Sequence, residues 1–137
     1  MWWIYALLSA FFASLTAIFA KIGVTGVSSN LATAIRTIII LLIAWGIVFF
    51  RGEYRSMGSL SKHSLLFLIF SGAATGLSWI FYFKALQIGK VSQVAPVDKL
   101  SVALTIVLSV VFLGEALNWK TAIGALLIIG GTLVIIL

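Results

Sequence analysis

The residues with the greatest potential for chemistry lie in the stretch 95–101, which reads Ala-Pro-Val-Asp-Lys-Leu-Ser. After Lys99 the chain is free of charge only as far as Gly114. Those residues, as a helix, span about 22 Å, against about 30 Å of bilayer hydrocarbon. A helix that crosses a membrane here must therefore begin before Asp98, near Val91, which puts two charges below the headgroups. Each costs about 2.5–3.5 kcal/mol, so we expect them to serve a function.

Hydroxyl side chains follow Asp98 along the same predicted helix. Ser101, Thr105 and Ser109 are spaced so that all three share a helix face with the carboxylate, whereas Lys99 points about 100° away. Asp98 is therefore the candidate for a carboxylate that responds to protons or cations. Lys99, Ser101 and Thr105 are further candidates for binding a substrate or an ion.

Pro96 lies about one turn inside this segment. Its nitrogen cannot donate to the Ser92 carbonyl and its ring clashes with that carbonyl, so we expect a helix kink or an opened turn. Irregular backbone at membrane depth is tolerated where it is buried or faces water. The alternative for Asp98 is a plain ion pair with Lys99 or Lys90 near the headgroups.

Arg36 is the second charged residue that we expect inside the membrane. The uncharged run that follows, Thr37 to Phe50, is too short to cross a bilayer by itself, so Arg36 must lie one to two turns inside its helix. Its long stem could let the guanidinium snorkel to the headgroups. Alternatively, it faces the other helices and meets a substrate anion or a carboxylate. Both interpretations remain open.

A charge-free segment before Lys84 carries further candidates. Ser78, Trp79 and Tyr82 would shape a binding cavity together with the hydroxyls of the Asp98 helix. Gly72 and Gly76 form a small-xxx-small pattern, which is typical of a helix-packing face in a membrane.

These residues must be positioned by helices that cross a membrane. The chain is 63% hydrophobic and 9% charged, which excludes a water-soluble domain. We predict an all-α, polytopic membrane protein with one domain over 1–137. Glu115 is expected to cap the last helix, with Asn118 as a second candidate. The five predicted transmembrane helices cover about 2–21, 30–50, 64–85, 91–113 and 119–137.

Several classes of function find no support in the sequence. There is no cysteine, and His63 stands alone in a hydrophilic loop, so we expect no metal site. The net charge of +6 comes from Lys and Arg scattered at segment ends, where they meet lipid headgroups, and we expect no nucleic-acid partner. No nucleotide loop, cofactor motif or nucleophile–base pair occurs, so we expect neither an enzyme nor a cofactor.

The order of these motifs resembles a single EamA repeat of the drug/metabolite transporter superfamily, closest to its five-helix bacterial/archaeal branch. The resemblance implies export or exchange of a small metabolite or drug across the inner (cytoplasmic) membrane, through a cavity near the bilayer midplane. Larger relatives carry two such repeats in opposite orientation. The residues that carry the resemblance are Arg36, Ala85-Leu86 with Gly89, the stretch 95–101, Phe112-Leu-Gly-Glu115, Ile123-Gly124 and Gly130.

One repeat needs a partner, because such transporters open the binding site to one side of the membrane and then the other by rocking one inverted repeat against the other. With the N-terminus inside, four basic residues fall in inner loops and three in outer ones, which is hardly an orientation bias. We therefore expect an antiparallel homodimer with dual topology. A fused or separate partner, a non-transporting subunit and a lipid or glycolipid-carrier flippase component are the alternatives. The basic residues counted are Arg51, Arg55, Lys62 and Lys120 inside, and Lys21, Lys84 and Lys90 outside.

Overall fold

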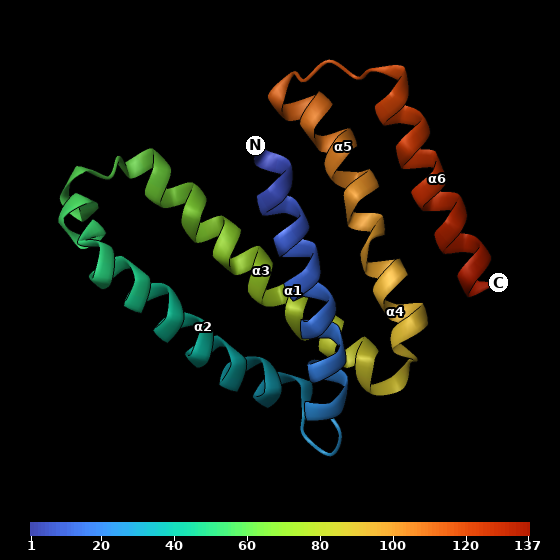
Figure 1. The fold of residues 1–137 in the computed structure, drawn as a ribbon, viewed down its shortest axis with the longest axis horizontal. Helices are drawn as coiled ribbons and strands as arrows, with labels where there is room; N and C mark the ends of the chain where they lie inside the picture. Colours follow the sequence, from blue (N-terminus) through green and yellow to red (C-terminus); the bar gives the residue numbers. More distant parts are fainter. The chain divides into compact units, whose positions relative to one another are not determined.

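The protein is all-α, as the sequence predicted. A computed structural model describes residues 1–137 and contains helices and connecting turns, without a strand (Figure 1). The elements in chain order are α1 (Trp2–Gly23), α2 (Ser29–Arg51), the 3-10 helix η1 (Glu53–Ser59), α3 (Lys62–Ile88), α4 (Val91–Asp98), α5 (Leu100–Leu113) and α6 (Trp119–Ile136).

Five helices are long and apolar enough to cross a membrane, with α4 and α5 together forming the fourth span, Val91–Leu113. Their large apolar side chains are mostly exposed; Phe50, for example, is 93% exposed. Exposed apolar surface on this scale would be unstable in water. It is the expected outer surface of helices in lipid, where each helix satisfies its own backbone hydrogen bonds.

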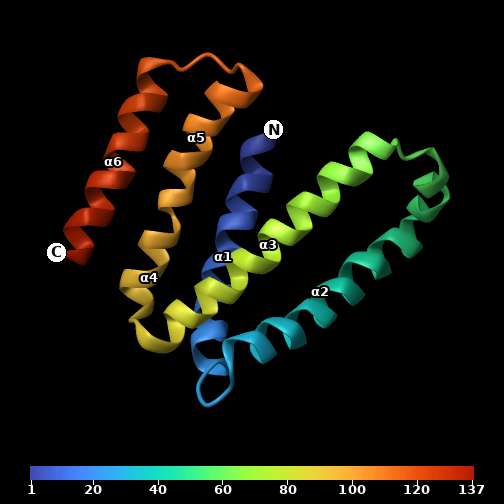
Figure 2. The same cartoon turned by 180° about the vertical axis from the view of Figure 1, so that it is seen from behind.

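The chain divides into two compact units. The first comprises residues 1–17 and 88–137. In it, α6 packs against both α5 and α4, and Figure 2 shows α5 and α6 side by side, joined by an irregular segment. Ala103 of α5 and Thr132 of α6 are buried.

The turn between α5 and α6 is built by Gly114 and Asn118. Gly114 has φ +66° and ends α5, and its N–H and that of Glu115 donate to the Ser109 carbonyl. Asn118 is the N-cap of α6, since its Oδ1 accepts from the Thr121 N–H at 2.8 Å. The prediction that Glu115 caps α6 is therefore wrong. Glu115 lies too early in the turn to reach the first turn of α6, and its backbone closes α5 instead.

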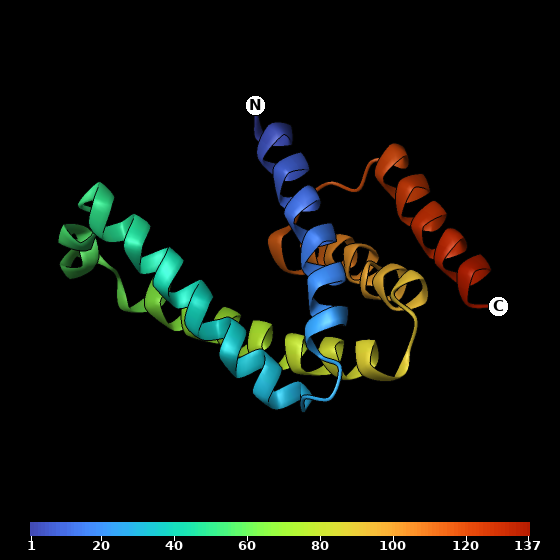
Figure 3. The same cartoon turned by 60° about the horizontal axis from the view of Figure 1, so that its bottom comes forward.

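The second unit comprises residues 18–87: the end of α1, the connection to α2, and the hairpin of α2 and α3 joined through η1 (Figure 3). Ser28 caps α2, with its hydroxyl accepting from the Leu31 N–H at 3.3 Å. Gly52, at φ +71°, ends α2 in the left-handed conformation that glycine adopts without strain. Phe83 and Leu86 of α3 are the most deeply buried side chains.

Candidate functional site

The stretch around Asp98 lies at an interruption of the fourth span. α4 ends at Asp98 and α5 begins at Leu100, so Lys99 alone separates the two helices. The Lys99 ammonium lies 3.3 Å from Asp98 Oδ2, and the Asp98 and Lys99 side chains are 34% and 58% exposed. The two candidate charges thus form an ion pair with each other at the break, although successive positions on a helix point about 100° apart.

The backbone at this break departs from regular helix three residues after Pro96, which lies inside α4. The Lys99 N–H is shared between the carbonyls of Ala95 at 3.2 Å and Pro96 at 3.1 Å, and the Lys99 carbonyl accepts from the Val102 N–H at 3.0 Å. The bonds to Pro96 and from Val102 are of the tighter 3-10 type. A one-residue 3-10 step therefore replaces the regular helix beside the carboxylate.

α6 contacts the break through a hydroxyl. Thr132, which is 4% exposed, donates both to the Pro96 carbonyl at 3.3 Å and to the Ile128 carbonyl of its own helix at 2.8 Å. The Pro96 carbonyl thus accepts two hydrogen bonds, one from the Lys99 N–H and one from α6. Thr132 was not among the predicted site residues, because its contact with Pro96 depends on how the two helices pack.

The hydroxyls that follow Asp98 are occupied as donors within their own helix. Thr105 donates to the Ser101 carbonyl at 2.8 Å, and Ser109 donates to the Ile106 carbonyl at 3.0 Å. Their oxygen lone pairs remain able to accept a hydrogen bond from a ligand.

Arg36 contacts α3. Its guanidinium carbon lies 3.9 Å from the ring centroid of Trp79 and 4.7 Å from that of Phe83, and Phe83 is only 1% exposed. Both distances are within the range of a cation–π interaction. The guanidinium therefore packs on aromatic faces of the neighbouring helix. Tyr82, one of the predicted cavity residues, is half-buried next to this stack, and Ser78 is exposed.

Below this stack a groove of about 370 Å³ runs between α2 and α3. A Cβ added to Gly72 or Gly76 would meet no atom within 4 Å, so both glycines border open space in the groove. Trp79 belongs both to the groove wall and to the Arg36 stack. The other residues that line the groove are Thr37, Ile40, Leu68, Ser71, Gly72, Thr75 and Gly76.

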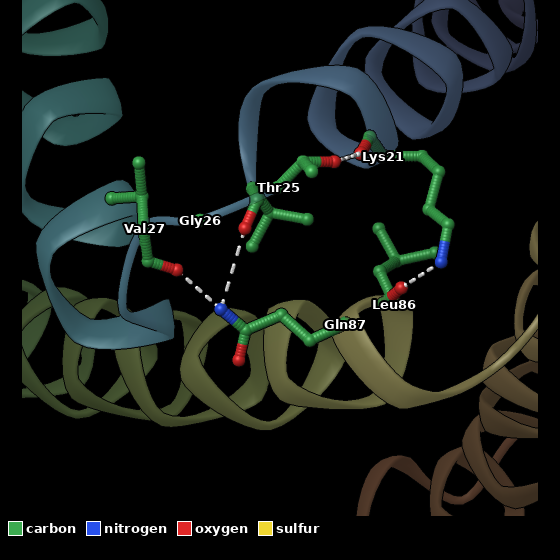
Figure 4. A pocket seen from close by; sticks show the side chains of 7 residues that line it. Lys21, Thr25, Gly26, Val27, Leu86 and Gln87 are labelled. Carbon is green, nitrogen blue, oxygen red and sulfur yellow. Dashed lines mark hydrogen bonds between the residues drawn. The ribbon is translucent and has the colours of Figure 1, made fainter.

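A second cavity, of about 270 Å³, lies where the connection between α1 and α2 meets the end of α3 (Figure 4). The Lys21 ammonium donates to the Leu86 carbonyl, and the Gln87 amide donates to the carbonyls of Val24 and Val27. We call this pair of contacts the Lys21–Gln87 clasp. The sequence analysis missed it, although an amide-bearing residue at the end of an apolar helix was a usable signal.

No group of three or more His, Cys, Asp and Glu side chains lies close enough to hold a metal ion. The ion pairs of the chain are Asp98 with Lys99 and, at the end of α2, Arg51 with Glu53 at 3.6 Å. The break beside Asp98 and the Arg36 contact with α3 are thus two charged features within the helices that can span a membrane.

Five membrane-spanning helices, one of them interrupted beside a charge pair, define the class as a polytopic membrane protein. The chain matches the EamA-like transporter family over residues 1–137, and it belongs to that family. It is 45% identical over 134 residues to an uncharacterized transporter in the cobO 3' region of Sinorhizobium sp., a match that covers 98% of this chain and 95% of that protein. No solved structure matches the chain. The prediction of an EamA-type membrane transporter is confirmed.

Proposed function

We propose that this chain forms half of an alternating-access transporter for a small metabolite or drug, completed by a second, antiparallel copy of itself in the inner membrane. The observation that carries the proposal is the number of spans, which is five. Transporters that rock one inverted repeat against another need two such repeats. The relative from Sinorhizobium is covered over 95% of its length, so it too has room for a single repeat.

The distribution of basic residues supports dual insertion. Counted with the N-terminus inside, four Lys or Arg residues lie in or next to the connections on the inner side and three on the outer side. The inner residues are Arg51, Arg55, Lys62 and Lys120. Because excess Lys and Arg keeps a loop on the cytoplasmic side, so small a difference leaves both orientations accessible. Two copies in opposite orientation then supply the two inverted repeats, one repeat from each copy.

In this proposal the break at Lys99 forms part of the cavity near the midplane. Asp98 binds the proton or cation that couples transport, and its ion pair with Lys99 holds the carboxylate when that ion has left. Ser101 and Thr105 offer lone pairs to the substrate. A helix interruption is a recurrent binding element in transporters, because it exposes backbone carbonyls to a polar cavity.

The test uses the absence of cysteine from the chain. One cysteine is added after Leu137, and intact cells are labelled with a membrane-impermeant maleimide before and after permeabilisation. We expect about half of the copies to react from outside. A matched variant with one cysteine at Ser59, in the loop on the other side of the membrane, must give the complementary half.

Disulfide cross-linking between copies completes the test. With a cysteine at either position alone, an antiparallel pair places the two thiols on opposite faces, so neither variant alone should cross-link but their co-expression should. If every copy reacts from the same side, the antiparallel homodimer is excluded and the inverted half must be another protein.

A further inference from the structure

The charges at membrane depth do not balance within one chain. Asp98 and Lys99 neutralise each other across 3.3 Å. Arg36 takes part in neither ion pair of the chain, and the only acid in its unit, Glu53, is bound to Arg51 at the far end of α2. One positive charge per copy therefore lies within a membrane-spanning helix without a carboxylate in its unit, and a counter-charge or a polar ligand would reduce the cost of placing it there.

The aromatic rings contact the face of the Arg36 guanidinium but do not accept hydrogen bonds from the N–H groups at its edge. The rings of Trp79 and Phe83 lie 3.9 and 4.7 Å from the guanidinium carbon and attract the cation through their π faces. The five N–H donors of Arg36 point outward in the guanidinium plane, where they match the two oxygens of a carboxylate or phosphate. The stack thus presents a fixed fork of donors that is suited to an anion.

The groove beside the stack suits an apolar body attached to that anion. Trp79 joins the two, and Ile40 and Leu68 supply apolar walls, while Gly72 and Gly76 keep one side open. Its volume of about 370 Å³ lies in the range of small-molecule pockets.

We propose that Arg36 and the groove between α2 and α3 bind a small organic anion, with its carboxylate or phosphate on the guanidinium and its apolar part along the groove. The inference rests on the proposed transport function and names the substrate class of that transporter. It commits to a freely diffusing anion, because the groove has the volume of a small-molecule pocket and the charge beside it is positive.

The test measures binding without transport, so that it remains informative whichever way the chain inserts. The protein is purified in phosphatidylcholine nanodiscs, and its thermal unfolding is followed with a panel of small aromatic and aliphatic carboxylates and phosphates. Each anion is paired with its neutral amide or alcohol and with the matching amine. We expect members of the anion series to raise the melting temperature with increasing concentration, as ligands of the folded state do, and the neutral and cationic counterparts to have no effect.

Matched variants assign the effect to the site. Arg36→Gln should weaken binding of the stabilising anions at least tenfold. Arg36→Lys should keep part of it, because a charge remains without the planar fork. The control is Arg55→Gln, which removes the same charge from an exposed arginine that also lies over a ring, that of Tyr54 at 5.9 Å, and it should bind like the unmodified protein.

Three results would overturn the inference. The first is that no anion raises the melting temperature more than its neutral counterpart does, or that an anion stabilises Arg36→Gln as much as the unmodified protein. A second is stabilisation by phosphatidylglycerol in the nanodisc that depends on Arg36 and displaces the soluble anions, which would assign the guanidinium to lipid. A third is Gly76→Leu abolishing the dimer, which would assign the groove to a second copy; we expect this variant to lose anion binding and keep its oligomeric state.

Failure of this inference and failure of the proposed function are distinguishable. Maleimide labelling from one side only, together with Arg36-dependent anion binding, would remove the homodimer and leave the substrate class in place. Labelling from both sides without anion binding would keep the homodimer and remove the substrate class.

Discussion

The hydroxyl of Thr132 in α6 donates a hydrogen bond to the carbonyl of Pro96 over 3.3 Å, and Thr132 is buried. Pro96 is the residue that interrupts the fourth span, and Asp98 lies two positions further along the chain. The last helix therefore holds the interruption at a point next to the charged pair. A kink that would otherwise be free to straighten or open is supported by a side chain from another helix.

Thr132→Val is expected to weaken this support while keeping the shape of the side chain. Hydrogen bonds between membrane helices contribute about 0.6 kcal/mol on average and up to about 1.7, so we expect a loss of that size. The measurement is unfolding by a denaturing detergent in mixed micelles, followed by circular dichroism.

Thr16→Val is the control, since the Thr16 hydroxyl bonds only to the Phe12 carbonyl of its own helix at 2.9 Å. It should change the unfolding free energy by a few tenths of a kcal/mol at most. Equal losses in the two variants would mean that the contact with Pro96 adds nothing to stability.

Asp98→Asn is expected to abolish transport while the protein still inserts and assembles. The substitution keeps the size of the side chain and removes the charge that we assign to ion coupling. Transport is followed as the change in extracellular metabolites of cells that express the protein, and assembly by size-exclusion chromatography in detergent.

The ion pair offers a second variant to separate coupling from structure. If Asp98 serves only to neutralise Lys99, removing both charges in Asp98→Asn/Lys99→Gln should restore transport, because no unpaired charge is then left in the membrane. We expect the double variant to insert normally and to remain inactive.

Gln87→Leu is expected to release the connection between α1 and α2. The amide of Gln87 is the side-chain donor to the carbonyls of Val24 and Val27, and leucine fills its space without a donor. Hydrogen–deuterium exchange in nanodiscs should rise at least several-fold in peptides that cover residues 24–28, because local opening becomes easier. Gln93→Leu, at an exposed position of α4, should leave exchange in those peptides unchanged.

Asn118→Ala is expected to destabilise the start of α6 by about 1 kcal/mol, the usual effect of removing an N-cap. The side chain accepts hydrogen bonds from both the N–H and the hydroxyl of Thr121, at 2.8 and 3.0 Å. Glu115→Gln should have almost no effect on unfolding measured in the same way. A larger effect at Glu115 than at Asn118 would reverse the assignment of the cap.

The sequence by itself determined the helices and their class of protein. Apolar runs of sufficient length, separated by glycine, asparagine and charge, must be helical in lipid because each segment has to satisfy its own backbone. The same local reasoning predicted a disturbance near Pro96, and α4 and α5 are divided at Lys99. It also included Asn118 as the second candidate for the cap of α6. It chose Glu115 first at α6, because two acceptors within four residues cannot be ranked without the turn geometry.

Only the tertiary structure decided which side chains meet across helices. Only the structure shows that the Arg36 guanidinium lies 3.9 Å from the ring of Trp79 and 4.7 Å from that of Phe83. The Lys21–Gln87 clasp and the contact of Thr132 with Pro96 were not expected at all. Helix spacing places a residue on a face but does not say which face of which neighbour it contacts, because that depends on crossing angles and on the depth of each helix. The apolar faces of membrane helices permit many such arrangements, and the packing within each unit selects one.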